Sequence, residues 1–131
     1  MTVGLSAVNT ANKWLDVLRG ASGATFTTPA AMFIACHIGD PGAAGTGNPS
    51  TGIATRSSAA MNAASAGSAS LTATVSFAAT GADTITHISV WTASTSGTFL
   101  YSAALSASKT VANLDTLNLT ALTFALAPIA A

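Results

Sequence analysis

One short segment of the chain combines a thiol, an imidazole and a carboxylate, because Cys36, His37 and Asp40 lie within five residues. Such side chains could ligate a metal ion or pair a nucleophile with a general base. The segment ends an apolar run typical of a strand, and adjacent residues of a strand point to opposite faces. Cys36 and His37 therefore cannot serve one site without distortion. We expect Cys36 in the core, His37 on the other face and Asp40 capping a turn.

Other reactive groups lack the spacing that chemistry requires. His87 lies in a predicted strand beside Ser89 and Trp91, where we expect a packing or interface role. No Gly-x-Ser-x-Gly elbow is present, and the glycine-rich stretch 39–52 does not end in the Gly-Lys-Ser/Thr of a phosphate-binding loop. The aspartates are too far apart for a calcium loop and are expected to support turns: Asp16, Asp40, Asp83 and Asp115.

Folding could still bring two of these aspartates together, as in a glycoside hydrolase. Paired catalytic acids usually sit in a polar cleft with aromatic sugar platforms, whereas this chain offers Trp14, Trp91 and Tyr101 beside five phenylalanines. We therefore predict no catalytic, cofactor-binding or metal-binding residues and no enzymatic activity. A carbohydrate-cleaving enzyme is kept as the third of three interpretations.

The scarcity of charge indicates a component of a larger assembly. Only eight of the 131 residues are charged, the formal net charge is zero and half of the residues are hydrophobic. About a quarter of the residues of an ordinary soluble protein are charged, so we expect much of this surface to be covered by other copies or by a larger body. The four cations are scattered, which argues against nucleic acid and membrane surfaces as partners.

Length and apolar patterning limit the organisation of the chain. We expect one domain over residues 1–131, because this length suits a single core. The longest apolar run, residues 30–36, is far shorter than the roughly 20 residues that cross a bilayer. The N-terminal residues lack an export signal, and a single cysteine excludes an internal disulfide, which is compatible with a reducing cytosol.

Hydrophobic periodicity predicts a mainly β fold with one short N-terminal α-helix. Over residues 5–19, Leu5, Val8, Leu15 and Leu18 follow one helical stripe, which should pack on the sheet for the helix to persist. Alternating apolar residues predict strands over 32–38, 70–77, 85–92 and 98–105, the last two joined as a hairpin.

The connections complete an antiparallel β-sandwich, jelly-roll-like or immunoglobulin-like. Residues 39–52 are expected to form a long surface loop, whereas 59–67 fit a strand, an irregular segment or a helical turn. The apolar phase changes between Leu119 and Leu122, which predicts a bulge or an inserted turn in the last strand.

Several motifs, taken in order over about residues 33–124, resemble one group of viral proteins. They are His37–Thr46, Arg56, Thr86–Trp91, the hairpin Thr92–Leu100, Lys109–Val111 and Asp115–Leu117. In this order they resemble small virion proteins of tailed bacteriophages, commonly labelled tail fibre, minor tail, head decoration or structural proteins. The chain departs from the group at Leu114-Asp115, where glycine more often precedes the aspartate. The resemblance implies a non-enzymatic component of the virion, made in the cytoplasm of the bacterial host.

Low charge and this resemblance lead to two placements on the particle. The first interpretation is a capsid decoration protein that binds the major capsid protein outside the head as a symmetric oligomer, with a trimer expected. The alternative is a minor tail or tail-fibre protein that binds tail proteins at the tail tip; a carbohydrate-cleaving tail enzyme ranks third. The expected contact residues are Met61, Trp91, Phe99, Leu126 and Ile129.

Overall fold

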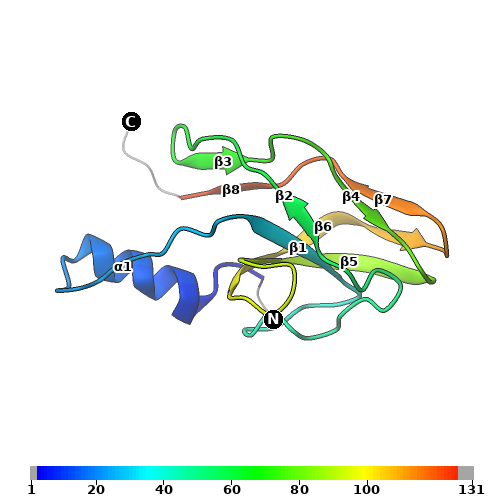
Figure 1. The fold of residues 1–131 in the computed structure, drawn as a ribbon, viewed down its shortest axis with the longest axis horizontal. Helices are drawn as coiled ribbons and strands as arrows, with labels where there is room; N and C mark the ends of the chain where they lie inside the picture. Colours follow the sequence, from blue (N-terminus) through cyan, green and yellow to red (C-terminus); the bar gives the residue numbers. More distant parts are fainter. Residues whose placement is uncertain (1–2, 127–131) are drawn as a thin grey trace.

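Four strands form one antiparallel sheet in the computed structural model, which describes residues 3–126 (Figure 1). Its order is β2-β1-β5-β6, from β2 (Ser57–Ala59), β1 (Met32–His37), β5 (Asp83–Trp91) and β6 (Phe99–Val111). Ile88 and Val90 on one face of β5 and Ser89 and Trp91 on the other are all buried, so both faces of this strand are covered.

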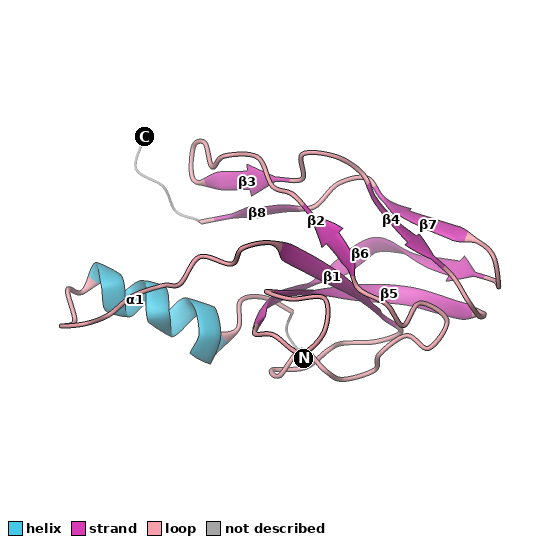
Figure 2. Cartoon of the chain, viewed as in Figure 1, coloured by secondary structure: helices cyan, strands magenta, loops and turns pink. Residues whose placement is uncertain are grey.

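The second layer is a long two-stranded ribbon that is broken once (Figure 2). It contains β3 (Ser68–Ser70), β4 (Val75–Ala78), β7 (Thr116–Leu119) and β8 (Thr123–Ala125), with β3 paired to β8 and β4 paired to β7. At the break the amide of Leu71 donates to the carbonyl of Leu122 over 3.0 Å. The predicted interruption between Leu119 and Leu122 is confirmed, and it lies where the chain passes from one strand pair to the other.

The core fills the space between the two layers. Ile34 and Ile85 from the four-stranded sheet meet Val75 and Phe77 from the ribbon, each at most 5% exposed. The mainly β, antiparallel fold is therefore confirmed. The strand predicted over 70–77 is split in two, because residues 71–74 carry the chain from partner β8 to partner β7.

A helical arm, residues 3–31, extends from one end of the sandwich (Figure 1). It contains the π-helical turn η1 (Ala7–Ala11) and helix α1 (Asn12–Leu18), so the predicted helix is present. The prediction that its apolar stripe packs on the sheet is wrong for Val8, Leu15 and Leu18, which are 71%, 60% and 82% exposed, whereas Leu5 forms a bridge with Tyr101 of β6. Within the arm, Trp14 packs edge-on against Phe26, and Phe26, in the segment that returns from α1 to β1, packs against the core of the sandwich.

The connection expected as a surface loop over 39–52 folds back onto the sheet. Pro41, Gly45, Ser50 and Gly52 are buried, and the amide of Ser50 donates to the carbonyl of Cys36. Residues 59–67 are mostly irregular, with single bridges at Met61 and Ser65. None of the helices within residues 3–126 is long and apolar enough to cross a membrane.

Candidate functional site

The segment Cys36–Asp40 is used for folding. Cys36 is 3% exposed, and burial raises the pKa of its thiol to about 12, so the nucleophilic thiolate is scarce. His37 points to the opposite face of β1, as predicted from its position next to Cys36. One carboxylate oxygen of Asp40 accepts a hydrogen bond from the amide of Gly42 over 2.8 Å, which confirms the predicted turn cap.

His37 belongs to a buried polar network. Its Nδ1 atom lies 2.7 Å from the carbonyl oxygen of Gly47, and its Nε2 atom lies 2.7 Å from the Oγ of Ser89. The indole Nε1 of Trp91 donates to the same Oγ over 2.7 Å. Burial is the largest cause that lowers the pKa of His37. Because His37 and Ser89 are 3% and 0% exposed, this pair has no access to a substrate.

The aspartates hold turns and ends of elements, as expected for dispersed acids. Asp83 accepts hydrogen bonds from the Ser50 hydroxyl and the Gly52 amide, which lower its pKa. Asp115 accepts from the amide of Ala112, and Asp16 forms an ion pair with Arg19 on the arm. Within residues 3–126, no group of three histidine, cysteine, aspartate or glutamate residues could hold a metal ion.

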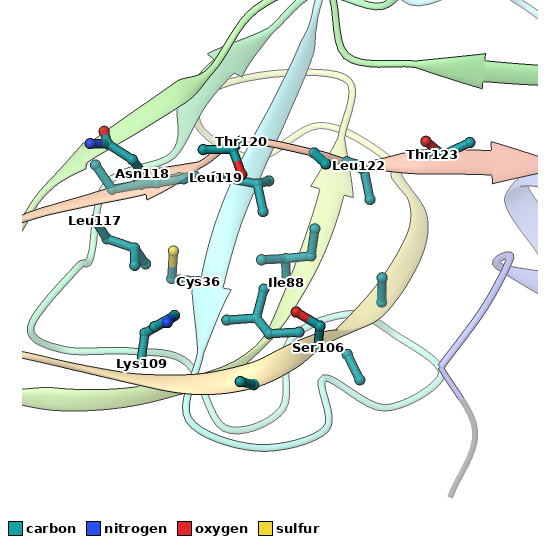
Figure 3. A pocket seen from close by; sticks show the side chains of 16 residues that line it. Cys36, Ile88, Ser106, Lys109, Leu117, Asn118, Leu119, Thr120, Leu122 and Thr123 are labelled. Atoms are coloured by element: carbon teal, nitrogen blue, oxygen red, sulfur yellow. The ribbon is translucent and has the colours of Figure 1, made fainter.

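One groove of the β domain runs between strand β6 and the segment 117–123 (Figure 3). Its volume is about 420 Å³. Cys36, Ile88 and Leu119 form part of its apolar wall, and Lys109 is the single charged residue that lines it. With one charge and no exposed aromatic platform, this groove lacks the polar cleft expected of a glycosidase.

The main chemical anomaly of the surface is the apolar arm. Six of the nine exposed large hydrophobic residues in the described chain lie in residues 3–18: Val3, Leu5, Val8, Leu15, Val17 and Leu18. Apolar residues grouped in this way on an exposed element mark contact surfaces in soluble proteins. The arm also encloses an apolar cavity of about 220 Å³ against the sandwich, which we call the socket; its walls include Leu5, Trp14, Phe26, Pro29, Met32 and Phe124.

The predicted contact residues occupy different environments. Trp91 and Phe99 are 7% and 4% exposed, pack with ring centroids 5.5 Å apart, and therefore contribute to the protein's own interior. The Arg56 guanidinium covers the Trp91 ring at 3.9 Å. Met61 is half-buried and bridges to Leu71, Leu126 is 53% exposed, and Ile129 lies outside the described residues. A contact role for these five residues stays a prediction.

Two features of the surface were not recognised from the sequence. The apolar stripe of the arm is visible in the sequence as helical periodicity, but this periodicity predicted packing on the sheet instead of exposure. Leu114 is 88% exposed at the turn between β6 and β7, and its only sequence signal is that it stands before Asp115 where the resembling proteins more often have glycine.

Comparison with known protein families agrees with the resemblance read from the motifs. The family model described as Podophage GP4 fiber I protein gp80 matches residues 4–127. No curated protein matches the chain. Because the family match covers nearly the whole chain, the protein belongs to the Podophage GP4 fiber I protein gp80 family and is a phage fibre structural protein, a component of the virion.

Proposed function

We propose that the protein is a tail-fibre subunit that attaches to the virion through the exposed apolar face of its N-terminal arm. The observation that carries this proposal is the grouping of six exposed large hydrophobic residues in residues 3–18, on an element that extends from the sandwich. An isolated soluble subunit gains nothing from this exposure. A subunit that inserts its arm between tail proteins buries it.

The energy available from the arm is sufficient to matter for assembly. Burying the exposed parts of Leu15 and Leu18 contributes about 3 kcal/mol, because complete burial of one such side chain is worth about 2 kcal/mol. Asp16 and Arg19 neutralise each other through an ion pair on the same helix. The partner surface is therefore proposed to be apolar and nearly neutral.

We further propose that the protein associates with copies of itself and has no enzymatic activity. Self-association is supported by the charge-poor composition, with eight charged residues in 131. A structural role is supported by the histidines and aspartates, since His37, Asp40, Asp83 and Asp115 all make hydrogen bonds within the fold. We also propose that the protein is made in the host cytoplasm, and its single cysteine is compatible with that reducing compartment.

Assembly of variant virions tests the role of the arm. The double variant Leu15→Ser, Leu18→Ser is expected to fold with an unchanged melting temperature but to be lost from purified particles. Ile38→Ser is the matched control, because it removes an aliphatic side chain that is 46% exposed outside the arm. Normal incorporation of the double variant would exclude the arm as the attachment surface.

Counting labelled copies on intact particles tests the placement. Gold-labelled antibody against the protein is expected at the tail, in a small number of copies per particle. Label spread in hundreds of copies over the head would favour the capsid decoration role and refute the tail placement.

A further inference from the structure

Leu114 combines a strained backbone with an exposed apolar side chain. Its φ is +72°, in the left-handed region that favours glycine and that a leucine adopts at a cost. The side chain is 88% exposed, so it gains no burial within this chain that would offset the strain. Strain of this kind persists where the surrounding structure imposes it, and it is found at contact and switch positions.

The turn around Leu114 is held firmly by hydrogen bonds. The Leu114 amide donates to the carbonyl of Ala79 over 2.9 Å, and the Ala79 amide donates to the carbonyl of Asp115 over 2.8 Å. The Asp115 carboxylate accepts from the amide of Ala112. These bonds hold the backbone of Leu114 and of Asp115, and the exposed side chain of Leu114 forms an apolar knob on this turn.

The socket at the base of the arm has the complementary shape and chemistry. It is lined by aliphatic and aromatic side chains and by Thr10, whose hydroxyl already donates to the carbonyl of Leu100. Its volume of about 220 Å³ is sufficient for a leucine side chain, since an apolar cavity of about 150 Å³ takes up benzene. Of the six exposed hydrophobic residues of the arm, Leu5 is the one that lines the socket, so an occupied socket leaves Leu15 and Leu18 free for attachment.

The charges beside the knob and the socket are opposite. Asp115 is next to Leu114, and Lys13 is next to Trp14 in a groove that shares Phe26 and Pro29 with the socket. Within the described residues 3–126, the single ion pair is that of Asp16 with Arg19, so neither Asp115 nor Lys13 is paired. A Leu114 that entered the socket of a second copy would bring these two charges toward each other.

We propose that Leu114 of one copy inserts into the socket of another copy and forms a head-to-tail contact. The turn between β6 and β7 lies at the end of the molecule opposite to α1, so the two halves of the contact lie far apart on one chain (Figures 1 and 2). Such a contact forms a ring if its rotation closes and a filament if it does not. The inference rests on the proposed self-association, and it shares only Leu5 with the proposed attachment surface.

The substitution Leu114→Gly tests whether the Leu114 side chain makes the intermolecular contact or has only a structural role. We expect it to raise the melting temperature by a few degrees, because the strain is released, while it weakens self-association at least tenfold. Ala66→Gly is the matched control: Ala66 has a φ of +47° and is exposed, so the change relieves strain without removing an apolar knob. Light scattering over a concentration series measures association. If Leu114→Gly associates as strongly as the wild-type protein, the proposed contact is wrong.

Mixing two variants tests the direction of the contact. Leu5→Asp places a charge in the socket and leaves Leu114 intact, and Pro29→Glu serves the same purpose if the first variant melts early. Leu114→Gly and the socket variant should each be monomeric, whereas their mixture should form one-to-one dimers through the remaining knob and socket.

The head-to-tail contact and self-association itself are contradicted by different results. If the mixture forms no dimers, or if oligomers are indifferent to both changes, the head-to-tail contact is wrong while self-association stands. A wild-type protein that is monomeric at millimolar concentration removes both, without bearing on the arm as a virion attachment surface.

Discussion

The Nε2 atom of His37 on β1 lies 2.7 Å from the Oγ of Ser89 on the adjacent strand β5. The Gly47 carbonyl can only accept, so Nδ1 of His37 carries a proton. In the neutral ring Nε2 therefore accepts from Ser89, whose oxygen accepts in turn from Trp91. The same two residue types at this distance would make a nucleophile and its base in an exposed site. Here the pair fastens the loop 39–52 to the sheet.

Removing the Ser89 hydroxyl should show how much this hydrogen-bond network contributes to the free energy of unfolding. Ser89→Ala leaves the Nε2 of His37 and the indole N–H of Trp91 buried without partners, and each such group costs about 1–3 kcal/mol. We expect a loss of about 3 kcal/mol in the free energy of unfolding, measured in urea. Ser108→Ala, at an exposed position of β6, is the control and should change stability by less than about 0.5 kcal/mol.

Stability should fall in weak acid because of His37. Burial lowers the pKa of His37 in the folded chain below its ordinary value of 6.5. Hydrogen bonding to the backbone of Gly47 and Asn48 opposes this shift, and the charges of His87, opposite in the β1–β5 register, and of Arg56 add to it. Between the two pKa values the unfolded chain binds more protons, so the stability present above pH 6.5 is lost as the pH falls, by at most about 1.4 kcal/mol per pH unit. The loss stops below the folded pKa.

Matched histidine variants identify the group responsible in urea unfolding from pH 7.5 to 4.5. His37→Gln should reduce the decline of the free energy of unfolding with falling pH, whereas His87→Gln should leave this decline unchanged. Asp83 acts in a different range: its lowered pKa contributes stability above about pH 3.8, which is lost as the pH falls through the folded pKa. If the stability of His37→Gln still declines as the pH falls, a group other than His37 takes up the proton.

Two glycines with the same backbone conformation allow the packing of the loop to be measured. Gly45 and Gly23 have φ values of +74° and +75°, but a Cβ on Gly45 would lie 2.3 Å from the Phe99 ring, whereas a Cβ on Gly23 would meet nothing within 4 Å. Alanine in this conformation costs about 1–2 kcal/mol at either position. Overpacking against Phe99 should add about 1–3 kcal/mol for Gly45→Ala. Equal losses in urea unfolding would mean that the ring moves aside.

The strands were predictable wherever the interactions are local. The alternation in residues 85–92 and 98–105 and the turn between them correctly predicted the β5–β6 hairpin, because strand pairs joined by a short turn are specified by neighbouring residues. The turn caps of Asp40 and Asp115 were also predictable, since an aspartate beside such a turn accepts from a nearby amide.

The remaining features depend on partners that periodicity does not identify. A helical stripe indicates that Leu15 and Leu18 share a face, but not whether the same chain covers that face, and here it does not. The run 70–77 alternates without interruption, yet its pairing changes from β8 to β7, which depends on residues about 40 to 55 positions further along the chain. The left-handed backbone of Leu114 is imposed by hydrogen bonds to Ala79, so composition alone favours no such conformation.

The thiol of Cys36 should report whether the groove beside β6 opens. Figure 3 places Cys36 at the groove wall, but the residue is 3% exposed and burial raises its pKa to about 12. At pH 8 only about one thiol in 10⁴ is ionised, so we expect a thiol reagent to modify the native protein very slowly, and faster in proportion as urea unfolds it. An exposed cysteine, Ser108→Cys in a Cys36→Ala chain, is the control and should react at an ordinary rate. Fast native modification of Cys36 would mean that the two layers separate at the groove without global unfolding, because a closed sandwich keeps the sulfur away from both reagent and hydroxide.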